Sequence, residues 1–264
     1  HTGFNIANTV IMFPFSGLFV KMAEKLATIT SKNVGEDETV PVHLDDRILS
    51  TPSIAMSNCT KEIVRLGNMS LKNLTAACES LENRDGSRVE KILEREKNID
   101  NLTKAITAYL VKLCNSNLTK QENTNATGMF HIVNDMERIG DQASDIAELI
   151  PHLGEGDTYD ACSHIPAMAQ VALEMVHGAI NAFVEGDVQK AKEIINKDDI
   201  VDDYFDKVKN EVADLLREKT GSVDVILNFL MIAKYFERIG DHAENICEWV
   251  EFSKTGEYKD ERII

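Results

Sequence analysis

The chain has 264 residues, of which 43% are hydrophobic, with a formal net charge of −16 and an isoelectric point near 4.9. This length and composition allow a sizeable core and exclude a disordered protein. The acidic balance and the scattered lysines and arginines exclude nucleic acid as a partner, because a phosphate-backbone binder normally carries a basic patch. The five cysteines are widely spaced and form no C-x-x-C pair, which indicates reduced thiols in a cytosolic setting.

The N-terminal stretch, residues 2–20, carries no charge and is followed by Lys21 and Lys25. Its length is sufficient to span a bilayer, and the flanking lysines favour a cytoplasmic location for residues after about 21. We therefore expect residues 1–28 to be the end of a transmembrane domain and the protein to lie in the cell membrane. A buried helix of a soluble bundle is the alternative, because two asparagines and a proline interrupt the apolar stretch.

Residues 29–51 lack helical periodicity and contain prolines, a glycine and an acidic run, which indicates a linker. Residues 52–255 have a mostly helical pattern, divided by short polar segments. The average predicted helix is far longer than the roughly 11–12 residues typical of globular proteins, which favours elongated bundles. We predict an all-α fold of two tandem antiparallel three-helix bundles, residues 52–150 and 164–253, preceded by one transmembrane helix. The six predicted helices cover residues 52–83, 87–115, 121–150, 164–185, 187–219 and 222–253.

The pentapeptide ERIGD occurs twice, at residues 137–141 and 237–241. The similarity extends without a gap over residues 135–148 and 235–248, which identifies an internal repeat. In each copy a glutamate and an aspartate stand four residues apart. This spacing places both carboxylates on one face of a helix.

A second acidic pair repeats in the preceding helix of each set, where KILEREKNIDNL at residues 91–102 aligns with EIINKDDIVDDY at 193–204. These acids stand where the apolar stripe of each helix would continue, so we expect them to face inward or to lie at a seam between helices. Clustered carboxylates near a core repel one another unless a proton or a cation neutralises them. Oxygen ligands favour Mg²⁺, Mn²⁺, Ca²⁺ or iron, with zinc as a substitute. The alternative is a solvated acidic face that forms ion pairs with Arg138 and Arg238.

No enzymatic motif accompanies these acids. The di-iron bundle class needs two E-x-x-H motifs, and only Glu174 to His177 fits, off the apolar stripe of its helix. No G-x-S-x-G motif, phosphate-binding glycine loop or cysteine–histidine pair is recognisable. We predict that the chain is not an enzyme, with a metal-dependent phosphohydrolase as the less favoured alternative.

The repeated RIGD-x-A-x-x-I, together with the acidic pair of the preceding helix, resembles the PhoU domain, a six-helix phosphate regulator that binds metal clusters on its surface. The resemblance covers residues 51–255. The first copy departs from the family pattern, with Gln142 and Asp145 where the second has His242 and Asn245, so we expect its site to differ in charge or metal content. The resemblance implies divalent or iron cations (Mg, Mn, Fe or Zn) as cofactors, held by Glu96, Asp100, Glu137, Asp141, Asp198, Asp202, Glu237 and Asp241.

The start of the chain is similar to the junction in bacterial sodium-phosphate cotransporters that carry a C-terminal PhoU-like domain. The similarity lies in HTGFNIANTVIMFPF, LFVKMAEKLAT and LDDRILSTPSIAM. It implies the C-terminal part of a sodium-dependent phosphate transporter, whose metal-binding cytoplasmic domain regulates phosphate uptake. The implied partners are inorganic phosphate and sodium, through the membrane domain, and the membrane itself, and a homodimer is compatible with this reading. The alternative is a free-standing PhoU-type phosphate-signalling regulator.

Overall fold

The computed structural model describes residues 40–153, 162–255, 257–258 and 261–262. The predicted transmembrane helix and residues 29–39 of the predicted linker lie outside these residues. The long described elements are all α-helices, which confirms the all-α prediction, and they are followed by a short antiparallel pair of strands, β1 (Glu257–Tyr258) and β2 (Glu261–Arg262).

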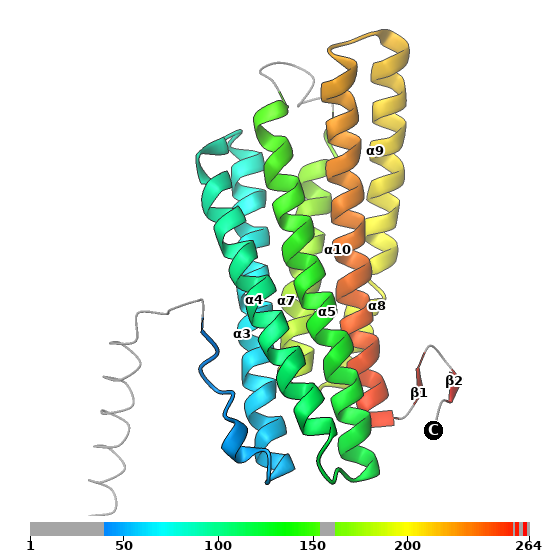
Figure 1. Cartoon of the computed structure of the whole chain (residues 1–264). Helices are drawn as coiled ribbons and strands as arrows, with labels where there is room; N and C mark the ends of the chain where they lie inside the picture. Colours follow the sequence, from blue (N-terminus) through cyan, green and yellow to red (C-terminus); the bar gives the residue numbers. More distant parts are fainter. Residues whose placement is uncertain (1–39, 154–161, 256, 259–260, 263–264) are drawn as a thin grey trace, which may run out of the picture. The chain divides into compact units, whose positions relative to one another are not determined.

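The first bundle consists of α3 (Pro52–Glu82), α4 (Val89–Cys114) and α5 (Lys120–Leu149), each of which packs against the other two (Figure 1). Helix α3 begins with a proline, whose fixed φ suits the first turn and whose missing N–H would have no helical partner there. A capping box starts α5, because the Thr119 side chain accepts from the Glu122 N–H while the Glu122 carboxylate accepts from the Thr119 N–H. Local signals therefore fix where the first and the third helix of this bundle begin.

The second bundle consists of α7 (Ile165–Glu185), α8 (Val188–Ile195), α9 (Asp198–Glu218) and α10 (Val223–Thr255). Helix α7 ends at Gly186, whose φ of 61° is left-handed and suits a residue without a side chain. Helix α10 packs against α7, α8 and α9 and therefore lies at the centre of this bundle.

The prediction of one continuous helix over residues 187–219 is wrong, because the chain interrupts it at Asn196 and Lys197. The Lys197 N–H donates to the Ile194 carbonyl, and the Ile200 N–H donates to the Lys197 carbonyl, which is the tighter bonding of a helix end. Asn196 is a weak helix former, and Asp198 and Asp199 favour a helix N-terminus through its dipole. The two aspartates thus start a new helix.

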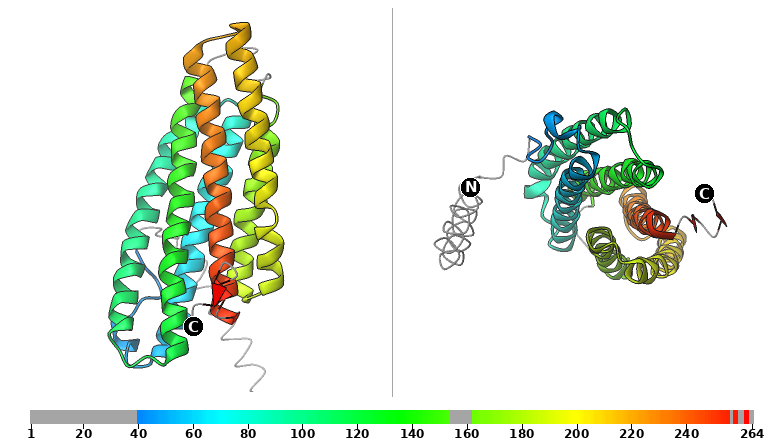
Figure 2. Two further views of the ribbon diagram at one scale, coloured as in Figure 1. Left: turned by 90° about the vertical axis from the view of Figure 1, so that its right-hand side faces the viewer. Right: turned by 90° about the horizontal axis from the view of Figure 1, so that it is seen from below.

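The two bundles share one hydrophobic core, with α5 against α10 and α3 against α7. Both views in Figure 2 show α5 (green) beside α10 (orange to red). Helix α7 is the one described helix that is long and apolar enough to cross a membrane, and half of its most apolar window is buried. Because it packs against α3 and α10, its apolar side chains belong to the core of the bundle.

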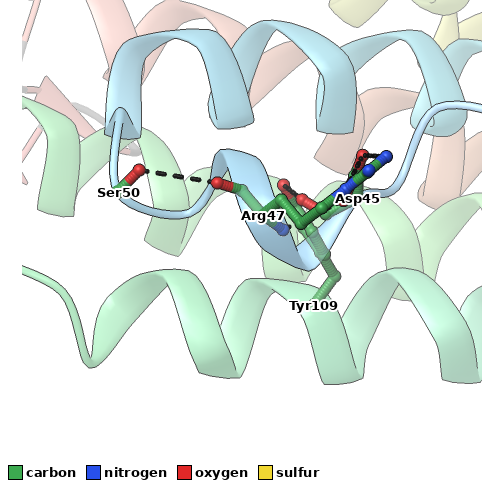
Figure 3. A network of polar contacts seen from close by, with 4 residues as sticks. All are labelled: Asp45, Arg47, Ser50 and Tyr109. Carbon is green, nitrogen blue, oxygen red and sulfur yellow. Dashed lines mark hydrogen bonds and ion pairs between the residues drawn. The ribbon is translucent and has the colours of Figure 1, made fainter.

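The described part of the predicted linker packs on the first bundle (Figure 3). The Tyr109 hydroxyl of α4 donates to the Asp45 carbonyl at 3.2 Å, and Lys112 Nζ lies 2.6 Å from Asp46 Oδ2. Glu62 of α3, which is fully buried, accepts the N–H groups of Val42 and His43 at 2.6 and 2.5 Å. The chain is therefore fixed to α3 and α4 before the first long helix begins.

Candidate metal-binding site

The first acidic face lies between α4 and α5. Helix α4 carries Glu96 and Asp100, and helix α5 carries Glu137 and Asp141. Partial burial raises the pKa of Glu96, and the charges of Asp141 and Asp100 raise it further. Burial also raises the pKa of Glu137, followed by the charge of Asp141. The structure therefore brings the four predicted residues of the first repeat within electrostatic reach of one another.

Basic side chains compensate part of this first face. Arg138 Nη1 lies 3.3 Å from Asp141 Oδ2, and Arg138 Nε lies 3.6 Å from Glu137 Oε2. Lys104 Nζ lies 2.6 Å from Asp100 Oδ2. Burial still raises the pKa of Asp141 although Arg138 lowers it. The ion pairs that the alternative reading expects of Arg138 thus exist, and they leave the carboxylates of Glu137 and Asp141 with raised pKa values.

The second acidic face lies between α9, with Asp198 and Asp202, and α10, with Glu237 and Asp241. Burial, followed by the charges of Glu244 and Asp241, raises the pKa of Asp198 to about 7. Burial and the charge of Glu237 raise the pKa values of Asp202 and Asp241 in the same direction. Lys234 Nζ lies 2.5 Å from Glu237 Oε2. A bound metal cation, in addition to Lys234, would relieve the repulsion between carboxylates that remains at Asp198.

The two glycines of the repeated motif permit close packing against side chains of the neighbouring helix. A Cβ at Gly140 would lie 3.0 Å from Ile99 Cδ1 of α4, and a Cβ at Gly240 would lie 2.9 Å from Asp198 Oδ1 of α9. Contacts under 3.0 Å require one of the groups to move. At both positions the nearest atoms of the neighbouring helix belong to its side chains and not to its backbone.

The chemical type of the predicted ligands suits a hard cation, since all eight are carboxylates. Among the residues that the structure describes, no group of three or more His, Cys, Asp or Glu side chains already has the arrangement of a metal site. Binding would therefore require the partly exposed carboxylate side chains to rotate toward a common point. Metal binding at these eight residues stays a prediction.

Sequence reasoning missed Glu244, whose charge is the largest electrostatic contribution to the raised pKa of Asp198. A signal was present, because Glu244 follows Glu237 by seven residues and Asp241 by three and so lies on the same helical face. The first repeat has Ser144 at the corresponding position. The two faces therefore differ in where the additional carboxylate stands, because the first repeat has Asp145 where the second has Asn245.

A polar contact between the repeats was also missed. His242 Nδ1 of α10 lies 2.9 Å from Asp135 Oδ1 of α5, and their side chains are 18% and 10% exposed. The aligned positions hold Gln142 and Tyr235, so the repeat has no second copy of this pair. No spacing within one repeat could reveal a contact made between the two.

A sequence model of the PhoU domain matches residues 63–150 and 165–250. The chain belongs to the PhoU family. A phosphate-specific transport system accessory protein PhoU homolog of Clostridium acetobutylicum is 31% identical over 201 residues, 75% of this chain and 92% of that protein. A PhoU homolog of Thermotoga maritima is 34% identical over 188 residues, which are 70% of this chain and 81% of that protein.

The solved structure of a PhoU phosphate transport system regulatory protein from Streptococcus pneumoniae superposes with a TM-score of 0.73 at 23% identity, covering 80% of this chain and all of that one. PhoU from Pseudomonas aeruginosa superposes with a TM-score of 0.69 at 24% identity, covering 76% of this chain and 97% of that one. These likenesses show the shared fold. The predicted PhoU resemblance and the tandem six-helix organisation are therefore confirmed, as is the prediction that the chain is not an enzyme.

The prediction of a sodium-phosphate cotransporter is wrong, because the relatives are named as PhoU accessory proteins. The prediction of its partners is therefore wrong as well. These partners were inorganic phosphate and sodium, through a membrane domain, and the membrane itself. The described part of that resemblance, residues 44–56, forms a 3₁₀ turn and the start of α3 and packs on the first bundle. This segment lies before the residues that the PhoU model matches, and nothing in the described residues supports the predicted localisation in the cell membrane.

Proposed function

We propose that this PhoU-family chain is a regulatory accessory protein of phosphate transport that works in the cytoplasm. The observation that carries the proposal is the doubled PhoU match over residues 63–150 and 165–250, with relatives named as accessory proteins of a phosphate-specific transport system. A cytoplasmic location is supported by the five cysteines, all free.

The regulatory protein is proposed to bind divalent or iron cations at both acidic faces. Glu96, Asp100, Glu137 and Asp141 would hold a cation in the first repeat, and Asp198, Asp202, Glu237 and Asp241 would do so in the second. A bound cation supplies positive charge that offsets carboxylate repulsion. Since each face is built from two helices, loss of the cation would weaken the attachment of α4 to α5 and of α9 to α10, which gives the protein a means of changing its surface.

The regulatory role is tested by expressing the chain in a bacterium that lacks its own PhoU protein. Uptake of radiolabelled phosphate is measured at low and high external phosphate. We expect the chain to restore the dependence of uptake on external phosphate. Unchanged uptake in cells that contain the folded protein, verified by its recovery in the soluble fraction, would contradict the proposal.

Metal binding is tested separately by elemental analysis after loading with Mn²⁺, Fe²⁺ or Mg²⁺. The wild type should retain metal, and the double variant Asp141→Asn with Asp241→Asn should lose most of it. A matched control replaces Asp214 and Asp224, which are exposed aspartates away from both faces, with asparagine. Wild-type protein that binds no metal would eliminate this part of the proposal and leave the regulatory role intact.

A further inference from the structure

A groove with concentrated positive charge lies between α3 and α4 in this strongly acidic chain. Its volume is about 630 Å³, within the range of roughly 300–1,000 Å³ typical of small-molecule sites. Its charged lining residues comprise four cations and one carboxylate, Glu79. The four cations are Lys72, Arg88, Lys91 and Arg95, and Arg88 forms an ion pair with Glu79, so the charged side chains of the groove retain a surplus of positive charge.

Part of the groove is apolar, because Leu71, Ala76 and Ile92 line it beside the charged groups. Ile92 is 1% exposed and belongs to the core, so it forms a fixed floor. A groove with this lining offers an apolar contact surface next to cationic groups. It suits a ligand that combines an anionic group with an apolar or aromatic part.

The Arg95 guanidinium is held in place before any ligand arrives. The residue is 5% exposed, and its Nη1 donates to Asn73 Oδ1 at 3.0 Å. Asn73 is fully buried, and its Nδ2 donates to the Ile92 carbonyl at 3.1 Å and to Ser144 Oγ at 3.4 Å. Three helices thus fix this arginine, which lowers the entropy that is lost when it binds an anion.

The groove is distinct from the acidic faces. Three of the cations, Arg88, Lys91 and Arg95, are spaced three and four residues apart, so they lie on one face of α4 and of the turn before it. Glu96 and Asp100 lie on another face of the same helix, toward α5. Helix α4 therefore separates a basic side from an acidic side.

The second repeat provides an internal comparison, because its corresponding positions are neutralised. In the aligned segments Glu193 replaces Lys91, and Lys197 replaces Arg95. Lys197 Nζ lies 2.8 Å from Glu174 Oε2 of α7, the first helix of that repeat. In the first repeat, α3 instead contributes Lys72 to the groove that Arg95 lines. The positive charge is a property of the first repeat alone and is not required by the fold.

We propose that the groove between α3 and α4 binds an organic phosphate of the nucleotide class, with Lys72, Arg88, Lys91 and Arg95 around its phosphates. A guanidinium group binds two phosphate oxygens at once, and a lysine adds a point charge. A ligand with several phosphates in a row therefore matches several cations better than a ligand with a single carboxylate. Leu71 and Ile92 would contact the base or sugar. This site would add a small-molecule input to the regulatory protein.

The test is calorimetric titration of the whole chain with ATP in EDTA, which prevents phosphate from binding through a metal ion. The double variant Lys72→Glu with Lys91→Glu gives the first groove the acidic character of the second repeat, which folds with Glu174 and Glu193. Both lysines are exposed, so the fold should be preserved, and circular dichroism checks this. We expect saturable ATP binding by the wild type and an affinity at least about tenfold lower in the variant.

A matched control reverses two other exposed lysines, Lys61 and Lys120, to glutamate and should bind ATP like the wild type. An equal loss of affinity in both double variants would overturn the proposal, because net charge and not the groove would then govern binding. Absence of saturable binding up to about 1 mM ATP would overturn it as well. Inorganic pyrophosphate that binds as tightly as ATP would overturn the assignment to an organic phosphate.

Discussion

The carboxylate of Asp198 lies against the backbone of Gly240, so closely that a Cβ at residue 240 would stand 2.9 Å from Asp198 Oδ1. Val201 Cγ1 would be the next neighbour, at 3.4 Å. The first turn of α9 therefore fits onto the middle of α10 through a glycine. The nearest group is the end of a flexible side chain, and it can move without disturbing the core.

Gly240→Ala should displace the Asp198 carboxylate and weaken metal binding, with little change in stability. An alanine in a helix interior stabilises by about 1 kcal/mol relative to glycine, which offsets the cost of moving one carboxylate. Elemental analysis and thermal unfolding measure the two effects. The control is Gly178→Ala, whose Cβ would collide with the Ile194 side chain in the core and should cost about 1–3 kcal/mol without changing metal content. Full metal retention in Gly240→Ala would contradict the role given to Asp198.

The metal-free protein should become less stable as the pH rises toward neutrality. The pKa of Asp198 is about 7 in the folded protein and 3.8 in the unfolded reference, so the folded state binds more protons between these values. Stability is therefore greatest below the unfolded pKa and is lost as the pH rises through the folded pKa. The effect at Asp198 is on the order of 1–2 kcal/mol after solvent screening.

Urea unfolding in EDTA between about pH 5 and pH 8 measures this loss. Asp198→Asn should flatten the profile, because asparagine does not titrate. A profile of the wild type that rises over the same range would show that the carboxylate is not destabilised by its surroundings.

Glu62 should hold the segment before α3, because its buried Oε1 accepts the N–H groups of Val42 and His43. Arg65 Nη1 also lies 3.1 Å from Glu62 Oε2. Glu62→Ala leaves two backbone donors without this acceptor and should cost about 2–4 kcal/mol. Limited proteolysis around residues 40–51 should become faster. The control Glu90→Ala, at an exposed glutamate of α4, should leave the cleavage rate unchanged.

Only Cys114 should react rapidly with a thiol reagent in the native protein, because it is the exposed cysteine. Burial raises the pKa of the Cys59, Cys78, Cys162 and Cys247 thiols to about 12, and all of them except the partly buried Cys78 are enclosed in the core. Thiolate is the reactive form, so Cys78 should react slowly and the three core cysteines only after denaturation. Spectrophotometric titration of thiols gives the count, and Cys114→Ser should remove the fast phase.

The helices were predictable because their apolar periodicity is long and their ends carry local signals. Helix α3 was expected at 52–83 and spans Pro52–Glu82, and α7 was expected at 164–185 and spans Ile165–Glu185. The break between Ile195 and Asp198 was not foreseen, because neither glycine nor proline marks it. Asn196 lowers helix propensity only slightly, so the aspartates that follow decide the outcome.

The acidic residues of the candidate site were predictable as helical faces, because spacing determines which side chains share a face. Their environment was not, since it depends on neighbouring helices: Lys104 pairs with Asp100, and Lys234 pairs with Glu237.

The transmembrane interpretation rested on length and absence of charge, which a buried helix shares. It concerned residues 2–20, outside the described part of the chain.

The packing of α5 against α10 makes the two repeats the halves of an internal dimer. A single repeat would expose the apolar side of its third helix, which the other repeat covers here, and would need a second copy to bury it. In a dimer of identical repeats, every substitution would appear on both sides. Fusion into one chain removes that constraint, so that one half carries Lys72 and Lys91 while the other carries His242 and Glu244. The two halves thus share a fold while their surfaces are free to specialise.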